Sequence, residues 1–142
     1  MSGQELLPIP SIETATEPVH SAEDLRQRWR ALMGPLGFGE KLLWFGFIGP
    51  DRRLIKMLSQ VPIGPRPQGR IVRRLMSDLR TLLDDTASGT TVALLLTGPG
   101  RRPISSADRA WAKALADAAE RFEVPLEPIF RANDESLLQI DA

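Results

Sequence analysis

The residues best suited to chemistry lie in the last third of the chain, around a short loop. An apolar run from Thr91 to Leu96 leads into the loop Gly98-Pro99-Gly100-Arg101-Arg102-Pro103, and Ser105-x-x-Asp108 then opens an amphipathic stretch. Such a loop can bind anions, because the first backbone N–H groups of a helix are free. Here the Gly-Lys-Ser/Thr ending of a phosphate loop is missing and two prolines remove backbone donors, so a turn with two solvated arginines is the alternative.

Ser105 and Asp108 have the spacing of a capping box at a helix start. The Ser105 oxygen can accept the N–H of Asp108, while the Asp108 carboxylate can accept the N–H of Ser105 and complement the helix dipole. Serine hydrolysis would instead need a base, and the single histidine, His20, lies in a segment expected to be a tail. The spacing therefore predicts a structural cap.

The same layout resembles the JAB/MPN metalloprotein superfamily, and within it the bacterial RadC-like branch. The resemblance covers about residues 41 to 138 and lies in three places: the hairpin near Asp51-Arg52-Arg53-Leu54-Ile55, the Gly-Pro loop with Ser105-x-x-Asp108, and a helix that runs into the strand Leu-Glu-Pro-Ile-Phe. It implies a JAB/MPN-like, cytidine-deaminase-like α/β/α domain in which helices flank a mixed β-sheet.

In that family, two histidines and an aspartate hold a zinc ion that activates water, and a glutamate takes the proton. The family carries His-x-His-Pro after the strand, whereas this chain has Leu96-Thr97-Gly98-Pro99, and residues 53–61 contain no acid. The resemblance thus implies a degenerate member without metal, cofactor or catalytic residues. We expect a pseudoenzyme that serves as a protein-interaction domain, its partner being another protein or a second copy of the chain.

The net charge of zero conceals three segments of unequal charge. Residues 1–24 hold five acids and no Lys or Arg, residues 41–80 hold nine basic and two acidic side chains, and residues 123–142 hold five acids against Arg131. Local potential, rather than total charge, attracts a charged partner. The basic middle segment is therefore a candidate binding surface.

Arginine dominates the candidate binding surface and suits bidentate contacts with carboxylate or phosphate. The candidate residues for binding an anion or a partner are Arg66, Arg70, Arg73, Arg74, Arg101 and Arg102. Three of them, at spacings i, i+3 and i+4, share one face of a helix expected over residues 69–85. The alternative function is an electrostatic binder of nucleic acid or of a ribonucleoprotein through this face. An ordinary solvated helix face is the simpler interpretation.

Hydrophobic periodicity and turn residues predict the elements that position these side chains. Helices are expected at residues 21–33, 69–85 and 106–122, and strands at 42–48, 53–61, 90–96, 124–130 and 137–140. Pro125 and Pro128 confine one strand to an edge or shorten it. Residues 1–20 are expected to be a disordered acidic tail, and residues 21–142 a single α/β domain.

Composition sets the remaining bounds. A chain of 142 residues can bury one hydrophobic core without disulfides, and the absence of cysteine suits a reducing compartment. No apolar stretch approaches the roughly 18 residues that cross a bilayer, and the first 20 residues lack the pattern of a signal peptide. We therefore expect a cytoplasmic protein without a membrane partner.

Overall fold

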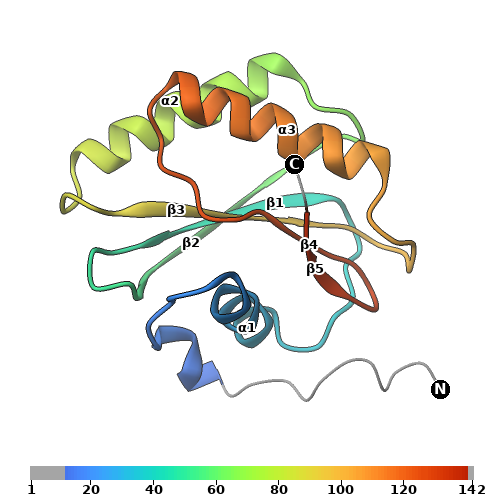
Figure 1. The fold of residues 1–142 in the computed structure, drawn as a ribbon. Coiled ribbons are helices and arrows are strands. Elements are labelled where there is room, and N and C mark those ends of the chain that lie inside the picture. The colour runs from blue at the N-terminus through green and yellow to red at the C-terminus, as the bar shows by residue number, and fades with distance from the viewer. Residues whose placement is uncertain (1–11, 141–142) are drawn as a thin grey trace.

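The computed structural model describes residues 12–140 and contains one mixed β-sheet with helices on both faces (Figure 1). The elements are η2 (Ile12–Thr16), α1 (Ala22–Met33), β1 (Leu42–Ile48), β2 (Leu54–Pro62), α2 (Gly69–Asp84), β3 (Thr91–Thr97), α3 (Ser106–Arg121), β4 (Phe130–Ala132) and β5 (Leu137–Gln139). Helices α2 and α3 cover one face of the sheet, and α1 covers the other. The predicted α/β class with a mixed sheet is confirmed.

Within the described residues, the sheet has five strands in the order β2-β1-β3-β4-β5. Strand β1 runs antiparallel to β2 and β3, β3 runs parallel to β4, and β5 is antiparallel to β4. Leu42, the first residue of β1, consequently lies between Pro62 of β2 and Thr97 of β3, and Thr97 pairs with Ala132 of β4. We call this side, where β2, β3 and β4 end and β1 begins, the carboxyl edge. Helices α2 and α3 both begin there, because each follows a strand that ends there.

The three α-helices begin and end where local sequence favours it. Ser21 caps α1 by accepting the N–H of Asp24, and Gly34, with φ of 63°, ends the helix in a conformation that suits glycine. Helix α2 has no side-chain cap and depends on its apolar face for stability. All three helices lie within one residue of their predicted bounds.

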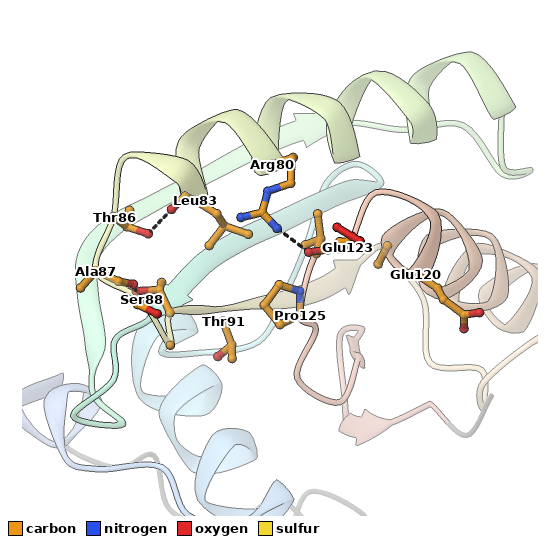
Figure 2. Close-up of a pocket in the computed structure, with 13 residues that line it drawn as sticks. Arg80, Leu83, Thr86, Ala87, Ser88, Thr91, Glu120, Glu123 and Pro125 are labelled. Carbon is orange, nitrogen blue, oxygen red and sulfur yellow. Dashed lines mark hydrogen bonds between the residues drawn. The ribbon is translucent and has the colours of Figure 1, made fainter.

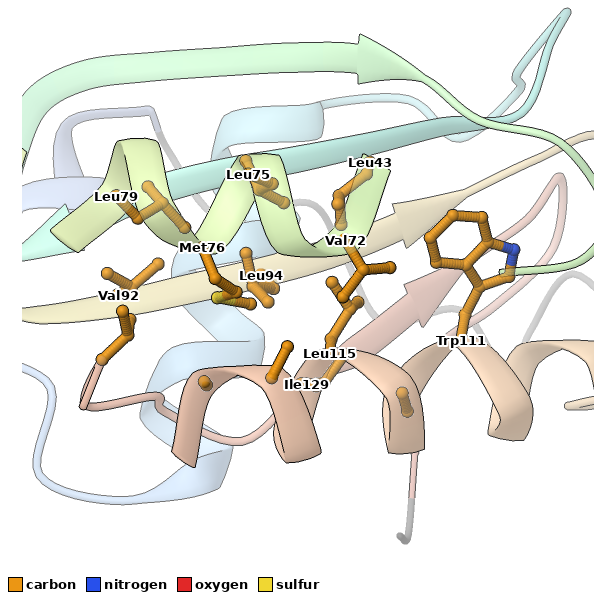
Figure 3. Close-up of a cluster of buried hydrophobic side chains, with 14 of the residues drawn as sticks. Leu43, Val72, Leu75, Met76, Leu79, Val92, Leu94, Trp111, Leu115 and Ile129 are labelled. Carbon is orange, nitrogen blue, oxygen red and sulfur yellow. The ribbon is translucent and has the colours of Figure 1, made fainter. Parts of the chain in front are cut away.

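Two clusters of buried apolar side chains hold the layers together. The larger cluster lies between the sheet and the pair α2 and α3, where Met76, Leu94 and Trp111 are among the buried residues (Figure 3). The smaller cluster lies under α1 and includes Trp29 and Phe130. Each face of the sheet is therefore covered, which explains the nearly continuous burial of β3.

The strand predicted at residues 124–130 is displaced toward the carboxyl terminus. The structure has a regular strand only at Phe130–Ala132, and Leu126 makes an isolated parallel bridge to Val92. Pro125 and Pro128 lack the N–H that a continuous ladder would need, so pairing becomes regular only after them. The predicted bounds of this strand are therefore wrong.

The prediction of a disordered tail through residue 20 is wrong for residues 12–20. Ile12–Thr16 is a 3-10 helix, and the side chains of Ala15 and Val19 are buried. The backbone N–H of Val19 donates to the carbonyl oxygen of Arg52 at 2.7 Å. This segment is polar in composition, but Ala15 and Val19 pack against the domain. Residues 1–11 of the predicted tail lie outside the described residues.

None of the helices within residues 12–140 combines the length and the hydropathy that a membrane-crossing helix requires.

Candidate functional site at the carboxyl edge

A polar pocket of about 290 Å³ opens at the carboxyl edge, beneath the loop that joins β3 to α3. Lys41 reaches it from the start of β1, Asp108 from the first turn of α3, and Arg131 from β4. Elements far apart in the sequence thus bring three charged side chains to the carboxyl ends of parallel strands, which is where α/β sheets commonly bind ligands. We call this cavity the Lys41 pocket.

Asp108 is buried at the start of α3 and takes part in the predicted capping box. Its backbone N–H donates to Ser105 Oγ at 3.1 Å, and its Oδ2 atom accepts the backbone N–H of Ser105 at 3.0 Å. The structural cap expected at Ser105 and Asp108 is therefore confirmed. The other carboxylate oxygen, Oδ1, lies 3.4 Å from Lys41 Nζ. Both oxygens of Asp108 are thus engaged by the protein itself.

Arg131 is a buried cation in the same pocket, with 6% of its surface exposed. Its Nη1 donates to the carbonyl oxygen of Arg102 at 2.8 Å, and its Nη2 lies 3.5 Å from Ser136 Oγ. Nε has no hydrogen-bond partner, and within residues 12–140 no carboxylate forms an ion pair with Arg131. Burial lowers the pKa of Arg131, while the nearby Asp108 charge raises it. Asp108 is thus the carboxylate that offsets both Lys41 and Arg131.

The neutral polar side chains of the Lys41 pocket are committed to internal hydrogen bonds. Thr97 Oγ1 accepts from Trp44 Nε1 at 3.0 Å, and Asn133 Nδ2 donates to the carbonyl oxygen of Arg102 at 2.8 Å. The Asn133 side-chain oxygen accepts the backbone N–H groups of Glu135 and Ser136. These groups therefore shape the pocket and leave its charged side chains to act on a ligand.

Asp134 holds the loop over the Lys41 pocket in place by accepting hydrogen bonds. Its carboxylate accepts the backbone N–H of Gly100 at 2.9 Å and that of Phe38 at 3.1 Å. These two hydrogen bonds, the Gly100 bond first, hold the pKa of Asp134 below its ordinary value, and Arg101 adds a smaller charge effect. Asp134 thus links the loop at Gly100 to the segment that precedes β1 at Phe38.

The zinc-ligand positions implied by the family resemblance also lie at this pocket. Leu96 is buried and belongs to the larger core cluster, and Gly98 has no side chain. Within residues 12–140, no group of three or more His, Cys, Asp or Glu side chains is arranged to hold a metal ion. Among the described residues that line the pocket, Asp108 is the one carboxylate, and Lys41 lies beside it.

The candidate arginines lie in two places, and all six are exposed. Arg66 precedes α2, and Arg70, Arg73 and Arg74 lie in its first two turns, where no ion pair engages them within the described residues. Arg101 and Arg102 line the Lys41 pocket in its covering loop, and Arg101 Nε lies 3.9 Å from Glu135 Oε2. Because α2 and α3 begin at the same edge of the sheet, both groups lie toward the carboxyl edge.

Sequence reasoning did not single out Lys41 or Arg131. Arg131 was visible only as the one basic residue in an acidic segment, and its flanking residues, Phe130 and Ala132, are small or apolar. A lone arginine within an apolar strand is a signal for a buried charge. Lys41 had no comparable signal, because its partner lies 67 positions away in the sequence.

Another cavity, of about 510 Å³, lies at the opposite edge of the sheet between the carboxyl ends of α2 and α3 (Figure 2). Arg80 crosses it, donating to the carbonyl oxygen of Glu123 and to Asp84 Oδ1. Thr86 Oγ1 donates to the carbonyl oxygen of Leu83 at 2.8 Å. The donors of Arg80 thus fasten α2 to the end of α3, and this arginine does not extend the exposed group on α2.

An apolar groove of about 360 Å³ runs beside the edge strand β2. The residues that form it, called here the β2 patch, include Ala15, Leu32, Leu54, Ile55, Met57 and Leu58. Between the pairs Ile48↔Leu54 and Gly46↔Leu58, only Phe47 of β1 faces the three residues 55–57 of β2. A bulge of this kind bends a strand locally, and Ile55 and Met57 within it are exposed next to the groove.

The function of this chain is inferred from the geometry of its pockets and surface, because comparison with known proteins adds no relative. A scan against models of protein families finds no match, and a search of curated protein sequences finds none either.

Proposed function

We propose that this chain is a non-catalytic domain of JAB/MPN-like architecture that associates with a second copy of itself through the β2 patch. The observation that carries the association is a surface that is apolar, hollowed and located on an edge strand. Ile55, Met57 and Leu58 are 39%, 42% and 39% exposed. Exposed apolar side chains that gather at a groove on an edge strand mark interaction surfaces more often than scattered ones do.

The non-catalytic part of the proposal rests on the carboxyl edge. A zinc hydrolase needs about three ligands on a rigid frame and one open position for water. Leu96 lies in the core, Gly98 offers no donor atom, and Asp108 is engaged by Lys41 and by the backbone of Ser105. The order helix, hairpin, helix, strand, helix, strand is the order that the family resemblance implies, and it supports the proposed architecture.

A second copy suits the β2 patch because of its charge and shape. The described residues that line the groove are uncharged, although a quarter of the chain is Asp, Glu, Lys or Arg. The groove and the exposed side chains of β2 lie on one surface, so a two-fold axis can place the exposed side chains of each copy in the groove of the other. Such an isologous contact needs no further partner.

Sedimentation velocity over a range of concentrations tests the association. We expect the apparent mass to rise from 15.7 kDa toward twice that value, with little dependence on salt because the contact is apolar. Met57→Lys should keep the chain monomeric. Leu82→Lys is the matched control, because Leu82 on α2 is 41% exposed and lies away from the patch. A wild-type chain that stays monomeric up to about 1 mM, a very weak limit, would refute self-association.

Nucleic-acid binding is the second candidate function, favoured by the four exposed arginines at the start of α2. Phosphate contacts release counterions, so binding to RNA or DNA through this face should weaken steeply as salt increases. Replacing Arg70, Arg73 and Arg74 together with Gln should abolish it. A binding curve unaffected by salt, or unchanged in the triple variant, would exclude this function without bearing on self-association.

A further inference from the structure

We propose that the Lys41 pocket binds the oxyanion group of a small molecule, a phosphate or a carboxylate. This site is separate from the β2 patch and from the exposed arginines of α2. Its evidence is a formed cavity, two cations beside a single lining carboxylate, and a supply of hydrogen-bond donors without matching acceptors.

The first step in the argument is the charge balance. Arg131 is buried and Lys41 is half-buried; Asp108 lies 3.4 Å from Lys41 Nζ, and its charge also acts on Arg131. The other carboxylates near the loop are engaged elsewhere, since Asp134 accepts two backbone N–H groups and Glu135 faces Arg101. Burying a charge without a partner is costly, so the pocket favours an additional negative charge.

The second step is the supply of donors. An ammonium group has three N–H donors, and Lys41 uses one of them on Asp108. The side-chain acceptors of Thr97, Asn133 and Asp108 already accept hydrogen bonds from the protein. The groups that remain available in the pocket are N–H donors on cationic side chains. A ligand that complements these donors must carry negatively charged hydrogen-bond acceptors.

The third step concerns the rim and the size of the pocket. Arg101 and Arg102 line the same cavity from its covering loop, and the amino terminus of the 16-residue helix α3 adds a partial positive charge. The volume of about 290 Å³ is at the low end for ligand sites and suits a small molecule rather than a dinucleotide. Lys41 would make the direct contact, Arg131 would supply buried charge, and the two rim arginines would close over the ligand.

Titration of the full chain with inorganic phosphate and with acetate, each against sodium chloride at equal ionic strength, tests the site. The readouts are the melting temperature and the amide NMR shifts of Gly98 and Gly100, which report on the loop. We expect one or both oxyanions to raise the melting temperature and to shift these two amides in a saturable way. Phosphate alone, acetate alone or both would assign the ligand chemistry.

Lys41→Gln and Arg131→Gln should each weaken binding about tenfold or more, the effect of losing one charge-assisted hydrogen bond or charge. Arg74→Gln is the matched control, because it removes the same charge from an exposed position on α2. If Arg131→Gln does not fold, the Lys41 variant and the wild-type amide shifts still decide. Equal effects of chloride and both oxyanions, unshifted loop amides, or unchanged affinity in Lys41→Gln would overturn the proposal.

Discussion

Arg52 and Glu127 form a two-pronged ion pair that joins the β1–β2 turn to the segment between α3 and β4. Arg52 Nη1 lies 2.8 Å from Glu127 Oε2, and Nη2 lies 3.2 Å from Oε1. Arg52 Nε also donates to the carbonyl oxygen of Val19 at 2.8 Å, and Thr91 Oγ1 donates to Glu127 Oε2 at 2.7 Å. Arg52 has a φ of 65°, uncommon for a residue with a side chain, and these bonds hold it there.

Glu127→Gln should lower the free energy of unfolding by about 2 kcal/mol, within the range for hydrogen bonds to charged groups in partly buried positions. The amide cannot match the planar pair of donors on Arg52. Chemical denaturation measures the change, with Glu120→Gln on the exposed side of α3 as the control that removes the same charge. A loss no greater than that of the control would contradict the structural role assigned to this pair.

The stability contributed by Glu127 should depend on pH. The hydrogen bonds from Arg52 lower the pKa of Glu127 from its ordinary value of 4.5, and the bond from Thr91 adds to this against the effect of burial. A carboxyl whose pKa is lowered in the folded state stabilises fully above its unfolded pKa and loses that contribution as the pH falls through the folded value. The stability difference between wild type and Glu127→Gln should therefore shrink below pH 4.5. A constant difference from pH 7 to pH 3 would be inconsistent with this.

Val19→Ala should destabilise the protein by about 2 kcal/mol, because it removes two methyl groups from a buried site. Val19 is 1% exposed, whereas Ile12, in the same segment, is 61% exposed. Ile12→Ala is therefore the control and should change stability little. Hydrogen exchange offers a second measurement, since the Val19 amide that donates to Arg52 should be protected. Rapid exchange of this amide would show that residues 12–20 do not pack as described.

Ser105→Ala should lower the free energy of unfolding by about 1 kcal/mol, a typical loss for a helix cap. Asp108→Ala should cost more, because it also leaves Lys41 and Arg131 without their shared carboxylate. Neither change should alter the metal content of the protein. Thermal and chemical denaturation would measure both effects, and an unchanged melting temperature for both variants would argue against the capping role.

The purified chain should contain no stoichiometric zinc and should melt at the same temperature with and without a chelator. The physical reason is that Leu96 and Gly98 stand where the proposed family resemblance would place histidines, and neither side chain can coordinate a metal. Elemental analysis would measure the zinc content directly. One zinc per chain, or a fold lost in chelator, would overturn this prediction and the non-catalytic proposal with it.

Patterns within about twenty residues were sufficient to predict most of the elements. The helical spacing of apolar residues located α2 and α3, the apolar run after Gly89 located β3, and the Ser105-x-x-Asp108 spacing predicted the capping box. These features depend on backbone hydrogen bonds and side-chain periods that repeat locally, so the sequence alone carries them. The resemblance to a metalloprotein family remains an inference from the same local patterns.

Only the tertiary structure decided which distant residues meet. Lys41 and Asp108 are 67 positions apart, and Arg52 and Glu127 are 75 apart, so no local pattern links either pair. Val19 lies in a polar segment, and its burial depends on the position of the β1–β2 turn. The regular part of β4 begins after Pro128, where the residues that follow have free N–H groups to form hydrogen bonds with β3. Each of these outcomes depends on strand order and register, which local sequence does not encode.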